Sequence, residues 1–441
     1  MTFSKLNLNT PLLNALNDLG LQVPTAIQAN VFSVVMSGKD VCGIAQTGTG
    51  KTFAYLLPCL RQYQFLKEKS PQLLIIVPTR ELVQQVVEEV KKLTKYMSVL
   101  AVGVYGGVNL KPQAEEVKQG ADVLVATPGR LVDLLATGVV NPNKIKKLVI
   151  DEFDEMLNLG FRAQLKNIFD RLPERRQNLL FSATLNEEVE ALISTYFPNL
   201  VRVEATPVGT PLDNIAQSYY AVPNFYTKVN LLALLLAKQP DEMNKVLVFV
   251  STKQLADLVH EQLNDLLADA VQVIHSNKTQ NHRFTAVANF KAGNCRVLIA
   301  TDIIARGLDV AEVSHVINFD LPAVPENYIH RIGRTGRIGR EGIAISFVSE
   351  REGEQLAVIE KLMNYSIPVL PLPQHLDISE QVLLSEQPRE HNTAIKVKPP
   401  ARENVGAAFH QKSEKNTKVN VRRDHEAEKK KKYGKSYEKR K

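Results

Sequence analysis

Short apolar runs rich in valine, isoleucine and leucine alternate along the chain with longer stretches in which apolar residues recur at helical spacing. Runs of this kind predict strands buried on both faces of a parallel sheet. The first series comprises residues 40–45, 73–78, 122–127, 147–151, 178–183 and 201–205, and the second comprises residues 245–250, 271–275, 296–301, 315–319 and 342–348. Because helical segments separate these strands, the chain is predicted to fold as two α/β domains with parallel sheets.

A break between the two series lies at residues 205–217, where two prolines and a glycine stand in a polar setting. Such a stretch predicts a linker between domains. The predicted segments, in chain order, are a first domain at 1–205, a linker at 206–217, a second domain at 218–365, a transition region at 366–395 and a basic tail at 396–441.

The composition is typical of a globular protein, with 44% hydrophobic and 23% charged residues. No apolar run approaches the roughly 18 residues that cross a membrane, and the first ten residues lack the apolar core of a signal peptide. Cys42, Cys59 and Cys295 are odd in number and far apart, which argues against a disulfide framework or a zinc site. These features predict a cytoplasmic protein with no membrane partner.

The net charge of +7 is concentrated in the predicted tail. Residues 396–441 contain 16 Lys or Arg and 6 Asp or Glu, a net of +10, so the rest of the chain carries −3 (+7 minus +10). Few apolar residues accompany this charge, and such a segment is predicted to be disordered. It is expected to contact nucleic acid, with a protein partner or a purely solubilising role as the alternatives.

A phosphate-binding loop is predicted at 45–52, where AQTGTGKT lies between a predicted strand and a predicted helix. Gly48 and Gly50 allow backbone N–H groups to approach phosphate oxygens. Lys51 supplies a cation for the β- and γ-phosphates, and the Thr52 hydroxyl is a ligand for Mg²⁺. The usual pattern begins with glycine, where this chain has Ala45. The strand–loop–helix context of the stretch supports the prediction despite this difference.

Four acids surround a phenylalanine at 151–155, directly after the predicted strand that contains KLVI. Acids beside a buried strand need a cation, and in nucleotide-binding folds of this kind they hold Mg²⁺. Asp151 is the predicted metal ligand together with Thr52, and Glu152 is predicted to orient or deprotonate an attacking water. A solvated acidic turn that caps the next helix is the alternative.

With these motifs in order, the chain resembles a DEAD-box ATP-dependent RNA helicase of superfamily 2 over nearly all of residues 3–365, with DEFD as the variant of the name-giving motif. The stretches that carry the resemblance are GLQVPTAIQ (20–28), AQTGTGKT (45–52), PTREL (78–82), GG (106–107), TPGR (127–130), DEFD (151–154), SAT (182–184), VFVST (248–252), QNHR (280–283), ATDIIARGLD (300–309) and HRIGRTGR (330–337). The resemblance implies two RecA-like parallel-sheet domains in tandem, followed by the disordered basic tail.

ATP and Mg²⁺ are the cofactors that the resemblance implies. Gln28 has a side-chain acceptor and donor that can meet an adenine edge, and Phe3 is expected to stack on the base, a pair that would select ATP over GTP. Taken alone, Gln28 would more often be a structural amide. The nucleotide-contacting residues implied by the resemblance are Phe3, Gln28, Ala45, Gln46, Thr47, Gly48, Thr49, Gly50, Lys51, Thr52 and Asp309.

Arg334 and Arg337 lie three residues apart, and planar guanidinium groups suit the phosphate charge that develops during transfer. A surface ion pair is the alternative for either arginine. The resemblance also implies that Ser182 and Thr184 couple hydrolysis to duplex opening. The catalytic set that it implies is Lys51, Asp151, Glu152, Asp154, His330, Arg334 and Arg337.

RNA is the expected partner, bound across both domains through its backbone and 2′-OH groups rather than its sequence. The RNA contacts implied by the resemblance are Pro78, Thr79, Arg80, Gly107, Thr127, Arg130, Gln280, Arg283, Thr301 and Gly307. The predicted activity is RNA-stimulated ATP hydrolysis coupled to local, non-processive unwinding of RNA duplexes or to remodelling of RNA–protein complexes. An ATP-gated RNA clamp or scaffold with little strand separation is the alternative, and a DNA helicase is a weaker third interpretation.

Two positions depart from the family pattern. Ser276 follows a histidine where the family usually has glycine, which concerns only the local turn. Phe153 replaces the alanine of the DEAD motif, while the acids keep their spacing. Phe153 is therefore predicted to fill an apolar pocket behind the acids, because such a ring is too large to be accommodated without nearby adjustment.

Overall fold

The protein is described from a computed structural model of the whole chain. The structure describes residues 2–45, 48–67, 70–185, 187–204, 214–267, 270–302, 313–336 and 341–387. The predicted basic tail and most of the predicted linker lie outside these ranges. All the elements below belong to one compact unit, Met1–Glu386. No helix in the described part of the chain has the length and apolar character needed to span a bilayer.

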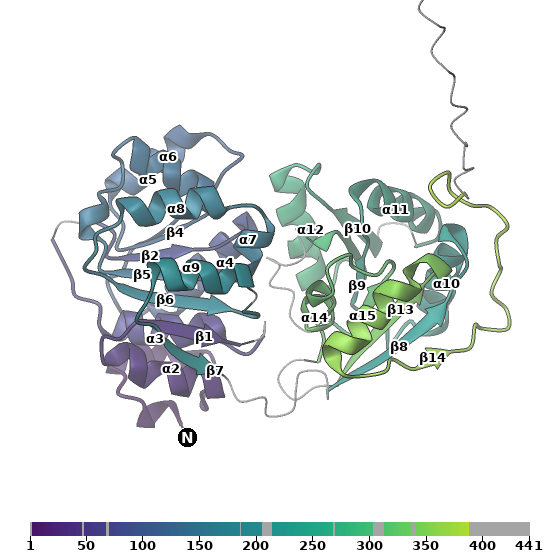
Figure 1. The fold of residues 1–441 in the computed structure, drawn as a ribbon, viewed down its shortest axis with the longest axis horizontal. Helices are drawn as coiled ribbons and strands as arrows, with labels where there is room; N and C mark the ends of the chain where they lie inside the picture. Colours follow the sequence, from purple (N-terminus) through teal and green to yellow (C-terminus); the bar gives the residue numbers. More distant parts are fainter. Residues whose placement is uncertain are drawn as a thin grey trace, which may run out of the picture. The chain divides into compact units, whose positions relative to one another are not determined.

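Seven strands form the first sheet, in the order β3-β4-β2-β5-β6-β1-β7 (Figure 1). Every pair in this sheet is parallel, so the carboxyl ends of all seven strands lie on the same edge. The strands β5, β6 and β1 are neighbours, and the loops that follow them therefore meet. The bounds are β1 (Val41–Ile44), β2 (Leu73–Ile76), β3 (Ala101–Val104), β4 (Val123–Ala126), β5 (Lys147–Ile150), β6 (Gln177–Ser182) and β7 (Val201–Glu204).

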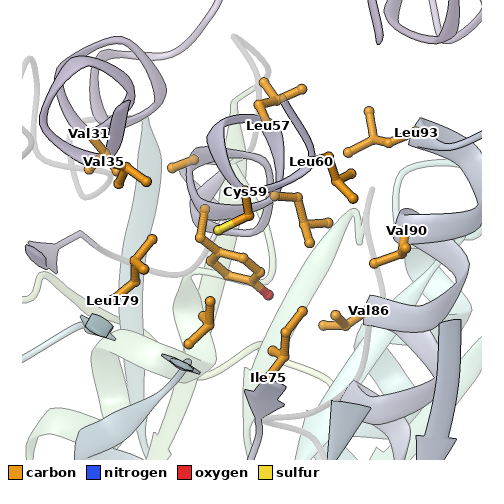
Figure 2. Packing of buried hydrophobic residues seen from close by; sticks show 14 of the residues in the cluster. Val31, Val35, Leu57, Cys59, Leu60, Ile75, Val86, Val90, Leu93 and Leu179 are labelled. Atoms are coloured by element: carbon orange, nitrogen blue, oxygen red, sulfur yellow. The ribbon is translucent and has the colours of Figure 1, made fainter. Parts of the chain in front are cut away.

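Helices cover both faces of this sheet. They are η1 (Phe3–Lys5), α1 (Thr10–Asp18), α2 (Ala26–Met36), α3 (Lys51–Arg61), α4 (Arg80–Leu93), α5 (Leu110–Gln119), α6 (Pro128–Ala136), η2 (Pro142–Lys144), α7 (Phe153–Asn158), α8 (Arg162–Arg171) and α9 (Glu187–Tyr196). Ile75 of β2 belongs to an apolar cluster with α1 to α4, and Ile76 to a second cluster with α5 to α9, as the two-residue repeat of a strand requires. In the first cluster, Val35, Leu60 and Val90 come from three different helices (Figure 2).

The second sheet also has seven parallel strands, in the order β10-β11-β9-β12-β13-β8-β14 (Figure 1). Its strands are β8 (Ile215–Ala221), β9 (Val246–Phe249), β10 (Val271–Ile274), β11 (Val297–Ala300), β12 (His315–Asn318), β13 (Gly342–Val348) and β14 (Val369–Leu370). One face is covered by α10 (Phe225–Lys238) and α11 (Lys253–Leu267). The other is covered by α12 (Gln280–Ala292), α14 (Glu326–Ile332) and α15 (Gly353–Met363), with η4 (Glu350–Glu352) leading into α15.

The chain beyond α15 packs back onto the second domain. Leu372, Leu376 and Leu383 contact the apolar cluster that α10 and α11 form over the sheet. The Asn224 side-chain amide, at the start of α10, donates to the carbonyl oxygen of Ser379 at 2.7 Å. The first part of the predicted transition region, up to Glu386, is therefore built into the second domain.

The predicted fold class, two parallel-sheet α/β domains in tandem, is confirmed. All eleven predicted strands are present, and three further strands, β3, β8 and β14, were not predicted. β8 begins at Ile215, inside the segment predicted as a linker. Strands β3 and β14 are at sheet edges and β8 is next to one. β14 has only two residues, and β8 mixes buried and exposed positions, so neither has the continuous apolar run on which the prediction depended. β3 is an apolar stretch with three of its four residues buried, and the prediction missed it.

Phe153 begins α7 directly behind the first two acids, and its side chain is fully buried, with 0% exposed. The ring belongs to the apolar cluster formed by α5 to α9, which also contains Met156 and Leu157. The prediction that Phe153 packs in an apolar pocket is confirmed. The ring ties the loop that carries the acids to the core.

We expect Phe153→Ala to lower the free energy of unfolding of the first domain by about 3–5 kcal/mol, because a buried ring is replaced by a cavity. Urea unfolding of the full chain measures the change. The matched control is Phe65→Ala, since the Phe65 side chain is 61% exposed and its loss should change stability by no more than about 0.5 kcal/mol. Equal effects of the two substitutions would contradict the packing role.

Candidate active site

The candidate active site begins in the loop between β1 and α3. Gly48 and Gly50 have φ angles of 89° and 88°, a left-handed conformation that side chains other than glycine rarely adopt. This turn delivers Lys51 to the first position of α3, where free N–H groups and the helix dipole favour an anion. Gln46 and Thr47, also predicted to contact the nucleotide, lie outside the described residues. The loop therefore has the backbone geometry of a phosphate site.

The acids of DEFD meet this loop from β5. Lys51 Nζ lies 3.3 Å from Glu152 Oε1. The Tyr55 hydroxyl donates to Asp151 Oδ2 at 3.0 Å, and the backbone N–H of Glu152 donates to Asp151 Oδ1 at 3.0 Å. Tyr55 was not predicted, although it stands four residues after Lys51 and so lies on the same side of α3. The structure thus brings the Lys51 ammonium to the carboxylates of Asp151 and Glu152, which lie about 100 residues further along the sequence.

Burial and charge move the pKa values of these groups in different directions. Burial raises the pKa of Asp151 to about 6, against the opposing effect of the Lys51 ammonium. Burial would also raise the pKa of Glu152, but Lys51, with the charges of His330 and Arg334, lowers it to about 2. Glu152 is therefore ionised at neutral pH, and Asp151 is the acid whose charge is least well compensated.

Glu152 has a strained backbone. Its φ and ψ angles are 55° and 52°, and it is one of two non-glycine residues with positive φ in the described ranges. The left-handed conformation costs a residue with a side chain about 1–2 kcal/mol. The strained residue directly follows Asp151, the candidate metal ligand. Strained backbone conformations of this kind cluster at active sites.

Asp154 connects the acids to the loop after β6. Its Oδ2 accepts from the backbone N–H of Thr184 at 2.9 Å and from the Thr184 hydroxyl at 2.8 Å. The Ser182 hydroxyl donates to the carbonyl oxygen of Thr184 at 2.7 Å, and Ser182 Oγ accepts from the backbone N–H of Asp154 at 3.3 Å. DEFD and SAT therefore form one hydrogen-bonded unit.

Gln28 contacts the phosphate loop directly. Its Nε2 donates to the carbonyl oxygen of Gly50 at 3.1 Å, and its Oε1 accepts from the backbone N–H of Thr25 at 2.9 Å. Phe3 is only 3% exposed and lies in the apolar cluster with α1 to α4. Stacking of Phe3 on a base stays a prediction, and this burial speaks against it because a stacking ring needs an open face.

In the second domain, α14 carries His330, and Arg334 follows it. Their charges act on Glu152, so the structure brings them into the electrostatic environment of the first domain's acids. The first arginine of the motif, Arg331, is 1% exposed and forms a bidentate ion pair with Asp302, at 2.5 and 2.8 Å. Arg331 was not predicted as a site residue and fixes α14 against the end of β11. Arg337, Asp309 and Gly307 lie outside the described part of the chain.

Three of the predicted RNA contacts, Arg80, Gln280 and Arg283, belong to one hydrogen-bonded network with Glu81. Arg80 Nη1 donates to Gln280 Oε1 at 3.1 Å. Gln280 Nε2 donates to Glu81 Oε1 at 2.9 Å, and the Arg283 guanidinium forms an ion pair with the same oxygen. Glu81 is 7% exposed and was not predicted as a site residue, although it stands in the PTREL stretch next to Arg80. These side chains link α4 of the first domain to α12 of the second.

The remaining predicted RNA contacts that the structure describes lie after the ends of strands in both domains. Thr79 caps α4, its hydroxyl accepting from the backbone N–H of Leu82 at 3.3 Å. Thr127 Oγ1 accepts from the backbone N–H of Gly106 at 3.3 Å. Gly107 has a φ of 75°, and a Cβ there would collide with the Arg80 guanidinium. Pro78 is buried after β2, Arg130 is held by Gln113 and the Val108 carbonyl, and Thr301 stands half-buried after β11.

Comparison with known proteins agrees with this geometry. The family model described as DEAD/DEAH box helicase matches residues 25–192, and that described as helicase conserved C-terminal domain matches residues 227–339. Among curated relatives, the DEAD-box ATP-dependent RNA helicase CshA of Bacillus cereus is 41% identical over 362 residues, which are 82% of this chain and 68% of that protein. CshA of Bacillus subtilis is 40% identical over 363 residues, covering 82% of this chain and 72% of that protein.

Solved structures give the same result. Saccharomyces cerevisiae Dbp5 bound to RNA and ADP BeF3 has a TM-score of 0.77 and 32% identity, over 84% of this chain and 96% of that chain. Mss116p bound to ssRNA and AMP-PNP has a TM-score of 0.78 and 27% identity, over 85% of this chain and 80% of that chain. Three findings lead to one conclusion. The two family models match in the expected order, the curated relatives exceed 30% identity, and the phosphate loop is paired with its acids. The chain belongs to the DEAD-box family of ATP-dependent RNA helicases.

Proposed function

We propose that the carboxyl edge of the first sheet hydrolyses ATP and that the second domain completes this site, so that hydrolysis drives local, non-processive opening of RNA duplexes. The observation that carries the proposal is the group of Lys51, Asp151 and Glu152, on which the charges of His330 and Arg334 also act. One domain supplies the phosphate loop and the acids, and the other supplies cations that suit phosphate charge. Arg337, by its place in the motif, is proposed as a further such cation.

The residues present fit a magnesium site. Asp151 is buried, anchored by Tyr55, and has a raised pKa, so it lacks a full counter-charge. Mg²⁺ usually takes only one or two protein carboxylates and completes its shell with phosphate oxygens and water. The described residues contain no cluster of three or more acids, histidines or cysteines that could hold a metal, which fits such a sparse set. Asp151 and Thr52 would hold the ion, which when bound neutralises charge on the β- and γ-phosphates.

Glu152 is proposed to position the attacking water. Its carboxylate is ionised and is paired with Lys51 in the structure. When the Lys51 ammonium turns to the phosphates, as its place in the loop implies, the Glu152 carboxylate is free to accept a hydrogen bond from water. The left-handed backbone of Glu152 holds it at the strand end, facing the loop.

Glu152→Gln keeps the shape of the side chain and removes the base. We expect turnover of ATP to fall about 10²–10⁴-fold, the usual contribution of general base catalysis, while binding of ATP and RNA persists. The measurement is RNA-stimulated ATPase beside equilibrium binding of a fluorescent ATP analogue. Glu187→Gln, at an exposed site at the start of α9, is the control and should leave turnover unchanged. Near-normal hydrolysis by Glu152→Gln would remove this residue from the catalytic set.

Gln28 is proposed to identify adenine. Each of its two polar atoms makes one bond within the protein, which leaves one lone pair on Oε1 and one hydrogen on Nε2. That remaining acceptor and donor are the pair needed for a bidentate contact with an adenine edge. Through its bond to the Gly50 carbonyl, Gln28 would also connect the bound base to the phosphate loop.

We expect Gln28→Ala to weaken ADP binding by about tenfold, since each lost hydrogen bond contributes about 0.5–1.5 kcal/mol, and to reduce the preference for ADP over GDP. Titration of both nucleotides into the full chain measures this. Gln22→Ala, which removes an exposed glutamine from the same motif, is the control. A uniform loss of ADP and GDP affinity would mean that Gln28 supports the loop without reading the base.

RNA is proposed to bind along the residues that join the domains, where Arg80, Gln280 and Arg283 surround Glu81. Arginine and amide side chains suit phosphate and sugar contacts, which carry no sequence information. Glu81 is proposed to hold these donors in position. Because one carboxylate serves both domains, RNA binding and domain closure would favour each other.

Glu81→Gln tests this arrangement, because it removes the charge that Arg283 needs while keeping the shape. We expect RNA-stimulated ATPase to require about tenfold more RNA, as expected when a charge pair loses one partner, whereas hydrolysis without RNA changes little. Glu88→Gln, at an exposed position of the same helix, is the control. An equal fall with and without RNA would place Glu81 in the folding of α4 instead.

The basic tail at 396–441 is proposed to add sequence-independent RNA contacts, given its 16 basic residues. The alternative function is an ATP-gated RNA clamp. It differs from the helicase in one respect, which is that ATP hydrolysis would proceed with little strand separation. A strand-displacement assay beside an ATPase assay on the same RNA duplex distinguishes the two, and the intact Ser182–Thr184–Asp154 unit favours duplex opening.

A further inference from the structure

A cavity of about 270 Å³ opens at the amino-terminal edge of the first sheet, where α3 ends and where β2, β4, β5 and β6 begin. That volume lies just below the usual range of about 300–1,000 Å³ for small-molecule sites. Leu60 and Leu73 supply an apolar wall, and Gln62, Gln177, Lys146 and Lys147 supply polar groups. The cavity is therefore neither wholly apolar nor wholly charged.

Lys147 is held in a fixed position in this cavity. Its Nζ donates to Gln177 Oε1 at 3.0 Å and to Gln62 Oε1. The amide nitrogens of the two glutamines donate to backbone carbonyls at the end of α2, those of Val35 at 2.9 Å and Met36 at 3.1 Å. Because the nitrogens are committed there, both amide oxygens must face the ammonium. The lysine is pre-organised by neighbours that carry no charge.

Among the described residues, no acid is paired with Lys147. The described residues that line the cavity include no Asp or Glu, and Lys146 adds a second positive charge. An ammonium has three N–H groups, and in the described chain Lys147 uses two of them, on the two amides. Burial lowers the pKa of Lys147, as expected where only neutral acceptors compensate the charge. An anion is the partner that this set of groups lacks.

We propose that this cavity is a second ligand site, which binds a small organic anion with its carboxylate or phosphate on Lys147 and its apolar part against Leu60 and Leu73. The site is separate from the nucleotide site. Lys51 stands at the first residue of α3, whereas the cavity lies at the last turn of that helix, about 16 Å away along its axis. Likewise Lys147 opens β5, and Asp151 follows its end.

Binding is measured on the full chain by calorimetric titration, with saturating ADP present to fill the nucleotide site. The probes are benzoate and phenyl phosphate, with benzamide as the neutral analogue. We expect at least one anion to bind with 1:1 stoichiometry and benzamide to bind at least about tenfold more weakly, because truncating a charge pair has at least that effect. The stronger of the two anions identifies the headgroup, carboxylate or phosphate.

Lys147→Met removes the ammonium and keeps an unbranched side chain of similar length. We expect it to lose affinity for the preferred anion by at least about tenfold, with RNA-stimulated ATPase within about twofold of the unsubstituted chain. The matched control is Lys144→Met, the same change at an exposed lysine that does not line the cavity. It should bind the anion like the unsubstituted chain.

A second measurement needs no variant. Amine acetylation of the unsubstituted chain, followed by mass spectrometry of its peptides, gives the modification rate of each lysine. The preferred anion should protect Lys147 from acetylation and leave Lys144 unaffected. The proposal is overturned if no probe binds, if benzamide binds as tightly as the anions, or if the anion protects Lys144 and Lys147 equally, since each outcome means that Lys147 does not select an anion in this cavity.

Discussion

Charge compensation at the carboxyl edge of the first sheet is the constraint on which the rest of the site depends. Lys51 is 5% exposed and Asp151 is 3% exposed, and an unpaired charge at such depth costs several kcal/mol. The phosphate loop and the end of β5 must therefore remain within ion-pair distance. The two apolar clusters around the sheet fix α3 and β5 and so maintain that distance.

The same constraint explains why the acids are strained and bonded on all sides. Glu152 is held in a left-handed conformation while its neighbours are anchored, Phe153 in the core and Asp154 on Thr184. With both neighbours anchored, the loop after β5 is held rigidly, and Asp154 joins it directly to Thr184 of SAT.

Between the domains, the buried Glu81 carboxylate is likewise compensated by neighbouring side chains. One carboxylate oxygen accepts from side chains of α12 while Arg80, its neighbour in sequence, reaches Gln280. The groups expected to contact RNA are thus already ordered by contacts within the protein. RNA phosphates would compete with, or add to, a network that is specific to the joined domains.

The sequence by itself determined most of the strands, the two-domain α/β class and the motifs of the candidate nucleotide site. Central strands are buried on both faces, so each forms an apolar run that can be recognised along the chain. The lysine, acids and glycines of the site lie in short motifs, which are also local in sequence. β8 and β14 are only partly buried and have no comparable pattern in the sequence. Only the tertiary structure decided which distant side chains meet, including Tyr55 with Asp151, Glu81 with Arg283 and Lys147 with Gln177. Tyr55 meets Asp151 and Lys147 meets Gln177 because parallel strand order brings together residues that are far apart in sequence. Glu81 meets Arg283 because α4 of the first domain contacts α12 of the second.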